Sequence, residues 1–379
     1  MKSVWRILSL IFIIQVSAST FQYVACQEES RYVRVAVFQE ERSLRVKLKA
    51  PFEITDSSGK VILSGNSLRT TVIAQKGGIA LAGEFFNVSS LIIRVDDHSF
   101  ISVNDRLFRG EIHFLRGKKD TLTVVNRIDI EDYVKGILYH EASHYWPMEA
   151  LMAQAVVSRT YVLYQMEKNK AKDFDVTSDI YSQVYGGRTS ERYRTNRAVE
   201  QTKGKILNFK GKVFPTFFSA TCGGHTEASF ALWKIDIAPL KGVVCGFCKD
   251  SPHFRWHYVL TLDEIQEKLE QGGIQTGPIK YLAISGRNES GRVRDLKIIT
   301  ADREMKVAAK DFRNLIGVNI IRSTRFNVNV VNQDAVFEGT GWGHGVGLCQ
   351  WGAYFMAKQG RTHEQILKYY YPGSRISHY

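Results

Sequence analysis

The hydrophobic pattern of this chain changes its period near residue 126. Before that point apolar and polar side chains alternate, as at Val33 and Val35, which predicts β-strands. After it apolar residues recur every three to four positions, as at Ile130, Val134 and Ile137, which predicts an amphipathic helix. A chain that uses both periods in separate stretches is expected to fold as an α+β protein.

These patterns also divide the chain. Residues 1–25 read as a leader, and residues 28–125 as an N-terminal β-rich domain. Residues 126–379 form a second predicted domain, a helical core with loop-rich and β segments. A second helix is expected to begin at Pro147, because proline is favoured in the first turn of a helix. Short β-like segments near 256–335 predict a β-containing insertion.

The N-terminus has the layout of a secretory signal peptide. Lys2 and Arg6 precede an apolar run at 7–16 that is too short for a membrane span, and small residues follow. Cys26 follows Val-Ala, which also resembles a lipoprotein cleavage site. We therefore expect an extracytoplasmic protein of the cell envelope, in the periplasm or on the outer face of the cytoplasmic membrane. It would be attached to the membrane only if it is lipidated or keeps its signal.

The net charge of +13 favours a polyanionic partner: nucleic acid, anionic lipid or acidic polysaccharide. The chain has no recognised nucleic-acid-binding motif, and the export signal conflicts with such a role. We therefore expect no nucleic-acid partner.

Glu141 occupies an unusual place in the first predicted helix. It lies seven residues after Val134 and four after Ile137, so it falls on the apolar stripe. A carboxyl group held against apolar surface has a raised pKa and can donate a proton near neutral pH. The alternative is a glutamate at a helix end whose carboxylate reaches water.

Cys222 and His225, and Cys245 and Cys248, form two pairs with two residues between the members of each. Three cysteines and one histidine at this spacing are typical of a closed structural zinc site. A disulfide between Cys245 and Cys248, with Cys222 free, is the alternative in an oxidising compartment. If one of that pair is not a ligand, the metal would keep an open position. Cys349 is expected to be a small buried hydrophobe.

Four sequence blocks, in order over residues 126–373, resemble the SpoIID/LytB family, and the ending Tyr369–Gly373 also fits. The blocks are Glu141–Tyr161, Asp175–Gly187, Phe218–Glu227 and Gly341–Ala353. The resemblance implies a peptidoglycan lytic transglycosylase that cleaves the MurNAc–GlcNAc bond of denuded glycan strands without water and leaves 1,6-anhydro ends. It would act in division or sporulation, and some members of the family carry zinc.

The resemblance maps the catalytic acid to Glu141. Ordinary glycosidases need two carboxylates, whereas an intramolecular sugar hydroxyl can replace the second. We expect Glu149 and Asp132 to point elsewhere, which favours a mechanism with a single acid.

The same blocks contain side chains that can stack on sugar rings or bind their hydroxyl, acetamido and lactyl groups. The predicted substrate-binding residues are Gln154, Arg159, Tyr161, Ser182, Gln183, Tyr185, Ser219, Trp342, His344 and Gln350. For Tyr161 and for Trp351, core packing is the alternative role.

One departure from the family pattern favours a second function. The family commonly has Met-Pro after the catalytic glutamate, and this chain has Ala142-Ser143. The alternative is a non-catalytic scaffold that binds glycan and recruits or activates a cell-wall amidase. Peptidoglycan glycan strands are the expected partner in either case.

Overall fold

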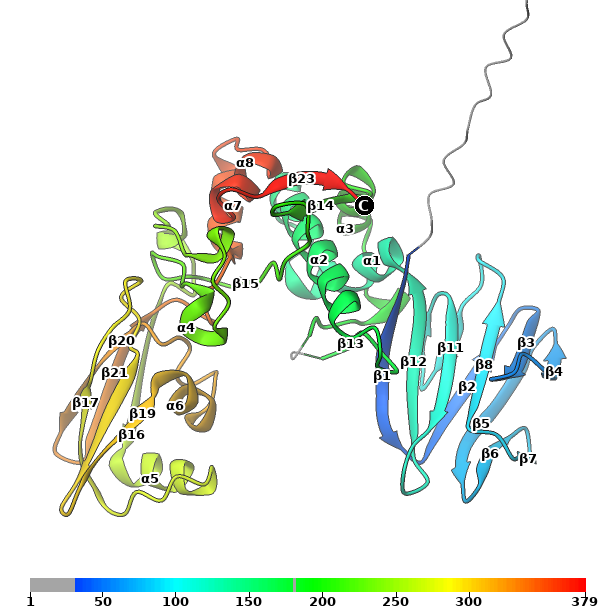
Figure 1. The fold of residues 1–379 in the computed structure, drawn as a ribbon, viewed down its shortest axis with the longest axis horizontal. Helices are drawn as coiled ribbons and strands as arrows, with labels where there is room; N and C mark the ends of the chain where they lie inside the picture. The colour runs from blue at the N-terminus through cyan, green and yellow to red at the C-terminus, as the bar shows by residue number, and fades with distance from the viewer. Residues whose placement is uncertain (1–30, 180–181) are drawn as a thin grey trace, which may run out of the picture. The chain divides into compact units, whose positions relative to one another are not determined.

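The computed structural model describes residues 31–179 and 182–379, and Figure 1 shows its helices and strands. The predicted signal peptide at 1–25 and Cys26 lie outside the described residues. Helices and sheets are both present, and the region after Arg31 is β-rich, so the α+β prediction is confirmed.

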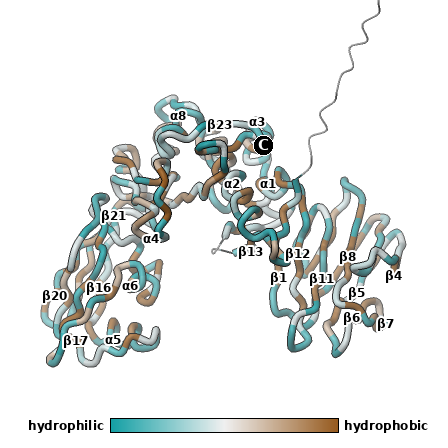
Figure 2. The backbone as a smooth tube through the Cα atoms, viewed as in Figure 1, coloured by the Kyte–Doolittle hydropathy of each residue, from teal (hydrophilic) through white to brown (hydrophobic). Residues whose placement is uncertain are grey.

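The N-terminal region contains two sheets whose buried faces belong to one hydrophobic cluster. In its order across the sheet, the seven-stranded sheet consists of β13 (Val176–Thr177), β1 (Tyr32–Glu41), β12 (Leu122–Asp129), β11 (Glu111–Arg116), β8 (Ser90–Val95), β3 (Phe52–Asp56) and β4 (Val61–Gly65). The six-stranded sheet consists of β10 (Arg106–Phe108), β9 (Ile101–Val103), β2 (Ser43–Leu48), β5 (Leu68–Gln75), β6 (Gly78–Leu81) and β7 (Glu84–Phe86). Figure 2 shows hydrophobic and hydrophilic positions following one another along these strands, as expected where one face of a sheet is buried.

Strand β12 leads directly into the first helix. Helix α1 (Ile130–Glu141) begins where the Asp129 carboxylate accepts hydrogen bonds from the backbone N–H groups of Glu131 and Asp132. Helix α2 (Met148–Lys168) begins after Pro147 and is buried continuously from Ala150 to Leu163. The other helices of this core are α3 (Tyr193–Gln201), α7 (Gln350–Lys358) and α8 (His363–Tyr370).

Helix α2 is buried all round because it lies between two hydrophobic clusters. Leu151 and Ala155 belong to the cluster of the N-terminal sheets, whereas Val156 and Val157 belong to a cluster formed with α7 and α8. A helix with core on both sides has little polar face, which separates α2 from an ordinary surface helix.

A third hydrophobic cluster holds together the elements between Arg255 and Thr340. One three-stranded sheet has the order β16 (Arg255–Thr261), β21 (Asp334–Thr340) and β20 (Phe326–Val331), and another has the order β17 (Ile279–Ile284), β18 (Asp295–Thr300) and β19 (Glu304–Ala308). Helices α5 (Leu262–Gln271) and α6 (Ala309–Ile316) pack with them. This region contains the residues predicted as the insertion.

The remaining elements are short connections. They are the 3-10 turns η1 (Gly187–Ser190), η2 (Ala238–Leu240) and η3 (Phe247–Asp250), helix α4 (Ser229–Trp233), and strands β14 (Lys205–Asn208), β15 (Phe218–Ser219), β22 (Leu348–Cys349) and β23 (Arg375–His378). Strands β15 and β22 pair in parallel, with Ser219 opposite Cys349, and so bring two of the sequence blocks together.

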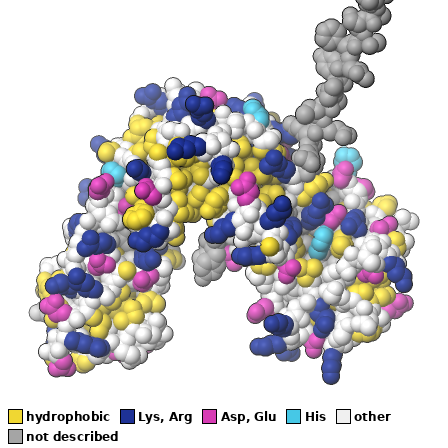
Figure 3. All heavy atoms as spheres, in the orientation of Figure 1, with side chains coloured by type: hydrophobic (Ala, Val, Ile, Leu, Met, Phe, Trp, Pro, Cys, Tyr) yellow, Lys and Arg dark blue, Asp and Glu magenta, His cyan; other side chains and the backbone are white. Residues whose placement is uncertain are grey.

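Figure 3 shows lysine and arginine side chains spread over the visible face and not gathered in one patch. Among the described residues, no helix is both long enough and apolar enough to cross a membrane.

Candidate functional site

Glu141 is the last residue of α1 and lies on a cavity of about 790 Å³. Its side chain is half-buried, and burial raises the pKa of its carboxyl group to about 7. A hydrogen bond with the backbone of Val184 acts in the opposite direction and lowers that pKa. A substantial fraction of Glu141 is therefore protonated near neutral pH, so it can act as a general acid.

The cavity draws its walls from segments far apart in the sequence. The lining residues are His140, Glu141, Tyr161, Ser182, Gln183, Val184, Phe217, Phe218, Ser219, Ala220, Trp233, Arg313, Trp342, Gly343, His344 and Gln350. Gln350, the first residue of α7, donates from Nε2 to the backbone carbonyl of Glu141 at 3.0 Å. This bond ties the glycine-rich C-terminal block to the end of α1.

Glu141 is the only carboxylate among the described residues that line the cavity. Asp132 is bonded to Lys135 at 3.0 Å. Glu149 accepts hydrogen bonds from the backbone N–H and Nδ1 of His363, at 2.6 and 2.8 Å. The described part of the lining therefore lacks the second carboxylate that ordinary glycosidases place opposite the acid.

The two histidines of the cavity are neutral near pH 7. Burial, and then the charges of Arg292 and Arg313, lower the pKa of His344 to about 3. His344 Nδ1 accepts from the backbone N–H of Val346 at 3.0 Å, which fixes the ring. Burial also lowers the pKa of His140, whose Nε2 lies 2.6 Å from Ser190 Oγ. His344 is thus held as a wall of the cavity by its backbone partner.

Seven of the ten predicted substrate-binding residues line this cavity: Tyr161, Ser182, Gln183, Ser219, Trp342, His344 and Gln350. Ser219 Oγ is buried and has no hydrogen-bond partner among the described residues, so it can bond a ligand hydroxyl. Trp351 packs against Trp146, with ring centroids 5.1 Å apart, and does not line the cavity.

Arg159 does not line the cavity, so the prediction that it binds lactyl or acetamido groups needs correction. Its side chain is 0% exposed, and Nε and Nη2 donate to the two carboxylate oxygens of Glu131 at 2.8 and 2.7 Å. Nη1 donates to the backbone carbonyl of Lys205 at 2.9 Å. All three nitrogens of its guanidinium group donate hydrogen bonds inside the protein, and these bonds link α2 to α1 and β14.

Tyr185 and Gln154 also lie outside the cavity lining. Tyr185 is 1% exposed, its hydroxyl donates to Asn126 Oδ1 at 2.7 Å, and its ring stacks on Tyr133. Gln154 is 2% exposed, and its Oε1 accepts from Gln350 Nε2 at 3.3 Å. Tyr185 is a core residue, and Gln154 supports a cavity residue from behind.

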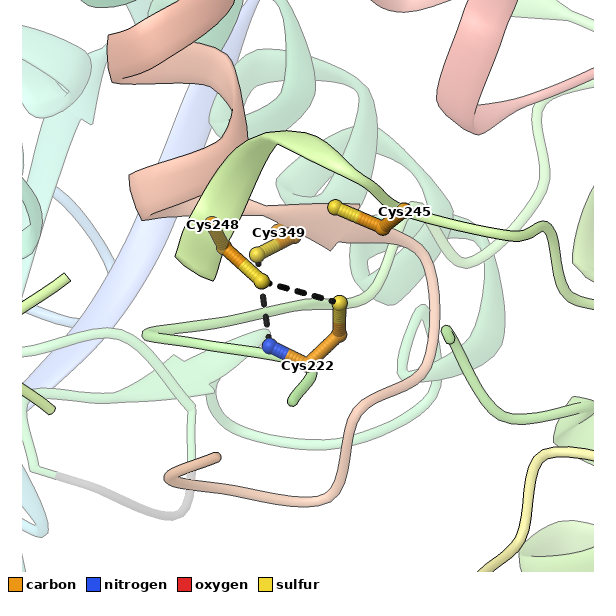
Figure 4. Close-up of side chains that lie close together, drawn as sticks. All are labelled: Cys222, Cys245, Cys248 and Cys349. Atoms are coloured by element: carbon orange, nitrogen blue, oxygen red, sulfur yellow. Dashed lines mark hydrogen bonds between the residues drawn. The ribbon is translucent and has the colours of Figure 1, made fainter. Parts of the chain in front are cut away.

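Cys222, Cys245, Cys248 and Cys349 form a second buried cluster, shown in Figure 4. Their sulfur atoms all lie within 4.8 Å of one another, and all four cysteines are free, so the alternative Cys245–Cys248 disulfide is not present. His225, predicted as the fourth ligand, is not part of the cluster. Cys349 takes its place, and is therefore more than the small buried hydrophobe that was expected.

The change of partner has a structural cause. His225 Nδ1 is bonded to the backbone carbonyl of Thr226 at 2.6 Å. The parallel pairing of β15 with β22 places Cys349 close to Cys222, whose backbone N–H donates to Cys349 Sγ at 3.2 Å. Hydrogen bonds from Cys222 and Cys248 hold the pKa of Cys245 well below its usual range. A hydrogen bond with Cys222 also lowers the pKa of Cys248. Four converging sulfurs are a donor set that can hold a soft metal ion.

Comparison with known families gives two matches. The family model described as stage II sporulation protein, SpoIID, matches residues 118–209, and a domain of unknown function, DUF8618, matches residues 243–347. Stage II sporulation protein D of Bacillus subtilis is 32% identical over 268 residues, which cover 67% of this chain and 76% of that protein. The chain belongs to the SpoIID family.

This SpoIID-family protein is also similar to two further proteins. An uncharacterized protein of Brachyspira hyodysenteriae is 33% identical over 92% of this chain and 93% of its own length. The amidase enhancer of Bacillus subtilis is 28% identical over 65% of this chain and 40% of its own length. The family predicted from the sequence blocks is thus confirmed.

The two matched regions of this SpoIID-family protein meet at the cavity. The SpoIID match contains Glu141 and Gln183, whereas the DUF8618 match contains Arg313 and His344. Sequence reasoning missed Arg313, Phe217 and Trp233. Arg313 lies in an ordinary amphipathic helix, α6, and nothing in its local sequence indicates that it lines the same cavity as Glu141.

Proposed function

We propose that this SpoIID-family protein is a lytic transglycosylase that cleaves MurNAc–GlcNAc bonds in denuded glycan strands of peptidoglycan. The observation that carries the proposal is Glu141, a single carboxyl group with a pKa of about 7 on a cavity whose described lining has no second carboxylate. The similarity to stage II sporulation protein D supports a role in the cell wall.

The proposed reaction uses Glu141 twice. Its protonated carboxyl donates a proton to the glycosidic oxygen that leaves with GlcNAc, and the bond from that oxygen to C1 of MurNAc breaks. The 6-hydroxyl of the same MurNAc forms a bond to C1 and gives its proton to the Glu141 carboxylate. The product carries a 1,6-anhydro ring, and the acid is regenerated. Because the nucleophile belongs to the substrate, proximity supplies much of the rate and no second carboxylate is required.

The cavity walls suit a sugar ring. Trp342 offers an aromatic face, and Trp233 stacks on Phe217 with ring centroids 4.1 Å apart. Gln183 and Ser219 bring an amide and a hydroxyl to the same space. Aromatic faces with a few polar groups are what a carbohydrate site needs to fix the orientation of its ligand.

We further propose that the four cysteines hold one structural zinc ion. Four thiolates complete a tetrahedral zinc shell and leave no open position for chemistry. Cys222 lies three residues after Ser219, and Cys349 directly precedes Gln350, so the ion would fix two cavity walls relative to each other. Metal would then be needed for folding of the site and not for the proton transfers.

A second candidate function is a glycan-binding scaffold that recruits or activates a cell-wall amidase. The amidase enhancer of Bacillus subtilis is among the relatives, and Ala142-Ser143 departs from the family pattern beside Glu141. In either role the partner is peptidoglycan. The export signal expected at residues 1–25 would deliver the protein to the extracytoplasmic cell envelope.

Mass spectrometry of denuded strands digested by the wild type and by Glu141→Gln tests the proposal. Anhydro ends from the wild type alone are the expected result. Reducing ends would mean hydrolysis and contradict the transglycosylase reaction. Absence of products from both proteins, together with faster cleavage by an added amidase, would favour the scaffold.

A further inference from the structure

Arg313 is the one residue of the insertion helices that lines the cavity of Glu141. It lies on α6, in the region that matches the domain of unknown function. No family function is attached to this region, so its entry into the cavity calls for an explanation of its own.

The Arg313 side chain has no protein partner in the described residues. Its Nε is buried and makes no hydrogen bond, and none of its nitrogens takes part in a hydrogen bond or ion pair within residues 31–179 and 182–379. Arg159 in the same protein shows the opposite pattern, because its Nε and Nη2 both donate hydrogen bonds to the Glu131 carboxylate. A guanidinium taken partly out of water without a counter-ion is unfavourable unless a ligand supplies the anion.

The charges of the cavity point the same way. Burial, and then the charge of Arg292, lower the pKa of Arg313 only to about 10, so the side chain stays cationic near neutral pH. His140 and His344 are neutral there, and a substantial fraction of Glu141 is protonated. Arg313 is thus the only fixed charge among the described lining residues, and it gives the cavity a positive charge.

We propose that Arg313 binds a carboxylate of the glycan strand and so selects which strands enter the site of Glu141. A planar guanidinium with free donors matches a carboxylate in two parallel hydrogen bonds. The inference rests on the proposed function, because it takes the glycan strand as the ligand of this cavity.

Two carboxylates of peptidoglycan can meet this requirement. The lactyl group of MurNAc ends in a free carboxylate on a denuded strand, but in an uncharged amide where a stem peptide is attached. Stem peptides carry carboxyl groups of their own. If the lactyl carboxylate is the ligand, an amidase that hydrolyses the lactyl–peptide bond must act first, and Arg313 detects that it has acted.

The test compares three substrates: denuded strands, denuded strands whose lactyl carboxyls have been converted to methyl amides, and peptide-bearing strands. Arg313→Gln is expected to lower kcat/KM on denuded strands by roughly 10- to 100-fold, the range for hydrogen bonds to a charged group. The wild type should lose as much on amidated strands, and the variant should lose nothing further there, since the two changes remove one interaction. Arg313→Lys should keep part of the preference.

Arg303→Gln is the matched control. Arg303 is an exposed arginine of the same region, lies between β18 and β19, and does not line the cavity. The Arg303→Gln variant should act on each of the three substrates as the wild type does. Melting temperatures of all variants separate loss of folding from loss of recognition.

Each outcome decides the proposal. An equal loss by Arg313→Gln on denuded and amidated strands would mean a structural role and overturn it. A loss confined to peptide-bearing strands would keep carboxylate recognition and assign it to the stem peptide. If the wild type cleaves nothing, binding of the strands to Glu141→Gln and to Glu141→Gln with Arg313→Gln gives the same comparison without catalysis. Unchanged binding there would overturn the inference, whatever becomes of the lytic activity.

Discussion

Glu141 and the four-cysteine cluster are both buried sites of ionisable side chains, but they are built over different distances along the chain. Glu141 takes its place from the period of one helix, with Val134 and Ile137 on the same side. The cluster needs Cys349, which reaches Cys222 only through the pairing of β15 with β22. A site set within one element can be inferred from spacing, whereas a site set between strands cannot.

The largest effect that we expect is the loss of reaction rate on substitution of Glu141, the site set within one helix. Glu141→Gln should lower the release of anhydro ends by roughly 10²- to 10⁴-fold, the usual contribution of a general acid or base. The fold should be kept, because the amide has the shape of the protonated acid. Product analysis by mass spectrometry gives the rate, with Glu167→Gln, an exposed glutamate of α2, as the control. Wild-type rates from Glu141→Gln would remove Glu141 from the mechanism.

Arg159 extends the comparison between local and long-range sites. It lies in a block that resembles the family, but its role depends on Glu131, which belongs to another helix. Arg159→Met leaves Glu131 buried without its counter-ion and should cost about 3–5 kcal/mol of stability. Chemical denaturation measures this loss, and Glu131→Gln should produce a loss of the same kind. If Arg159→Met instead kept its stability and raised KM, the residue would contact substrate after all.

The cluster makes a similar distinction between Cys349 and His225. Cys349→Ser should lower the free energy of unfolding by roughly 3 kcal/mol, as expected for a lost metal ligand, and should lower bound zinc measured by elemental analysis. His225→Ala should change neither quantity much, because its ring nitrogen bonds only a neighbouring carbonyl. Loss of zinc from His225→Ala with retention in Cys349→Ser would restore the ligand set predicted from spacing.

The smallest effect is a pH dependence of rate and stability that comes from Glu141. The rate should fall above pH 7, because the acid must be protonated and its pKa is about 7. His140, His344 and Arg313 line the same cavity. The folded-state pKa is raised above the ordinary value of about 4.5, so the folded protein holds this proton more tightly. The resulting stabilisation is complete below pH 4.5 and is lost as the pH rises through 7.

Rate profiles and denaturation curves from pH 3 to 9 measure both dependences, with Glu141→Gln as the reference for stability. The decline in stability above pH 4.5 should be weaker in that variant. An unchanged decline would mean that another group titrates, and an alkaline limb of the rate near pH 4 would mean that Glu141 is not held in an apolar setting.

The fold and the site could be predicted to different depths. The change of period near residue 126 predicted a β-rich region followed by helices, and the blocks predicted most of the cavity, since seven of ten predicted residues line it. Arg159 and Gln154 lie on α2 but do not line the cavity, because a position on a helix does not tell what covers that face. Tyr185 lies before η1 and is buried against Tyr133. Helix α2 lies between two clusters, so both of its faces are covered.

The sequence alone determined the period of each segment, the family and the position of Glu141 on an apolar stripe, because these depend on residues close together in the chain. Only the tertiary structure decided that Cys349 joins the cysteines and that Arg313 enters the cavity of Glu141. Both depend on strands and helices distant in sequence being packed together. That packing is a property of the whole core, and no local spacing records it.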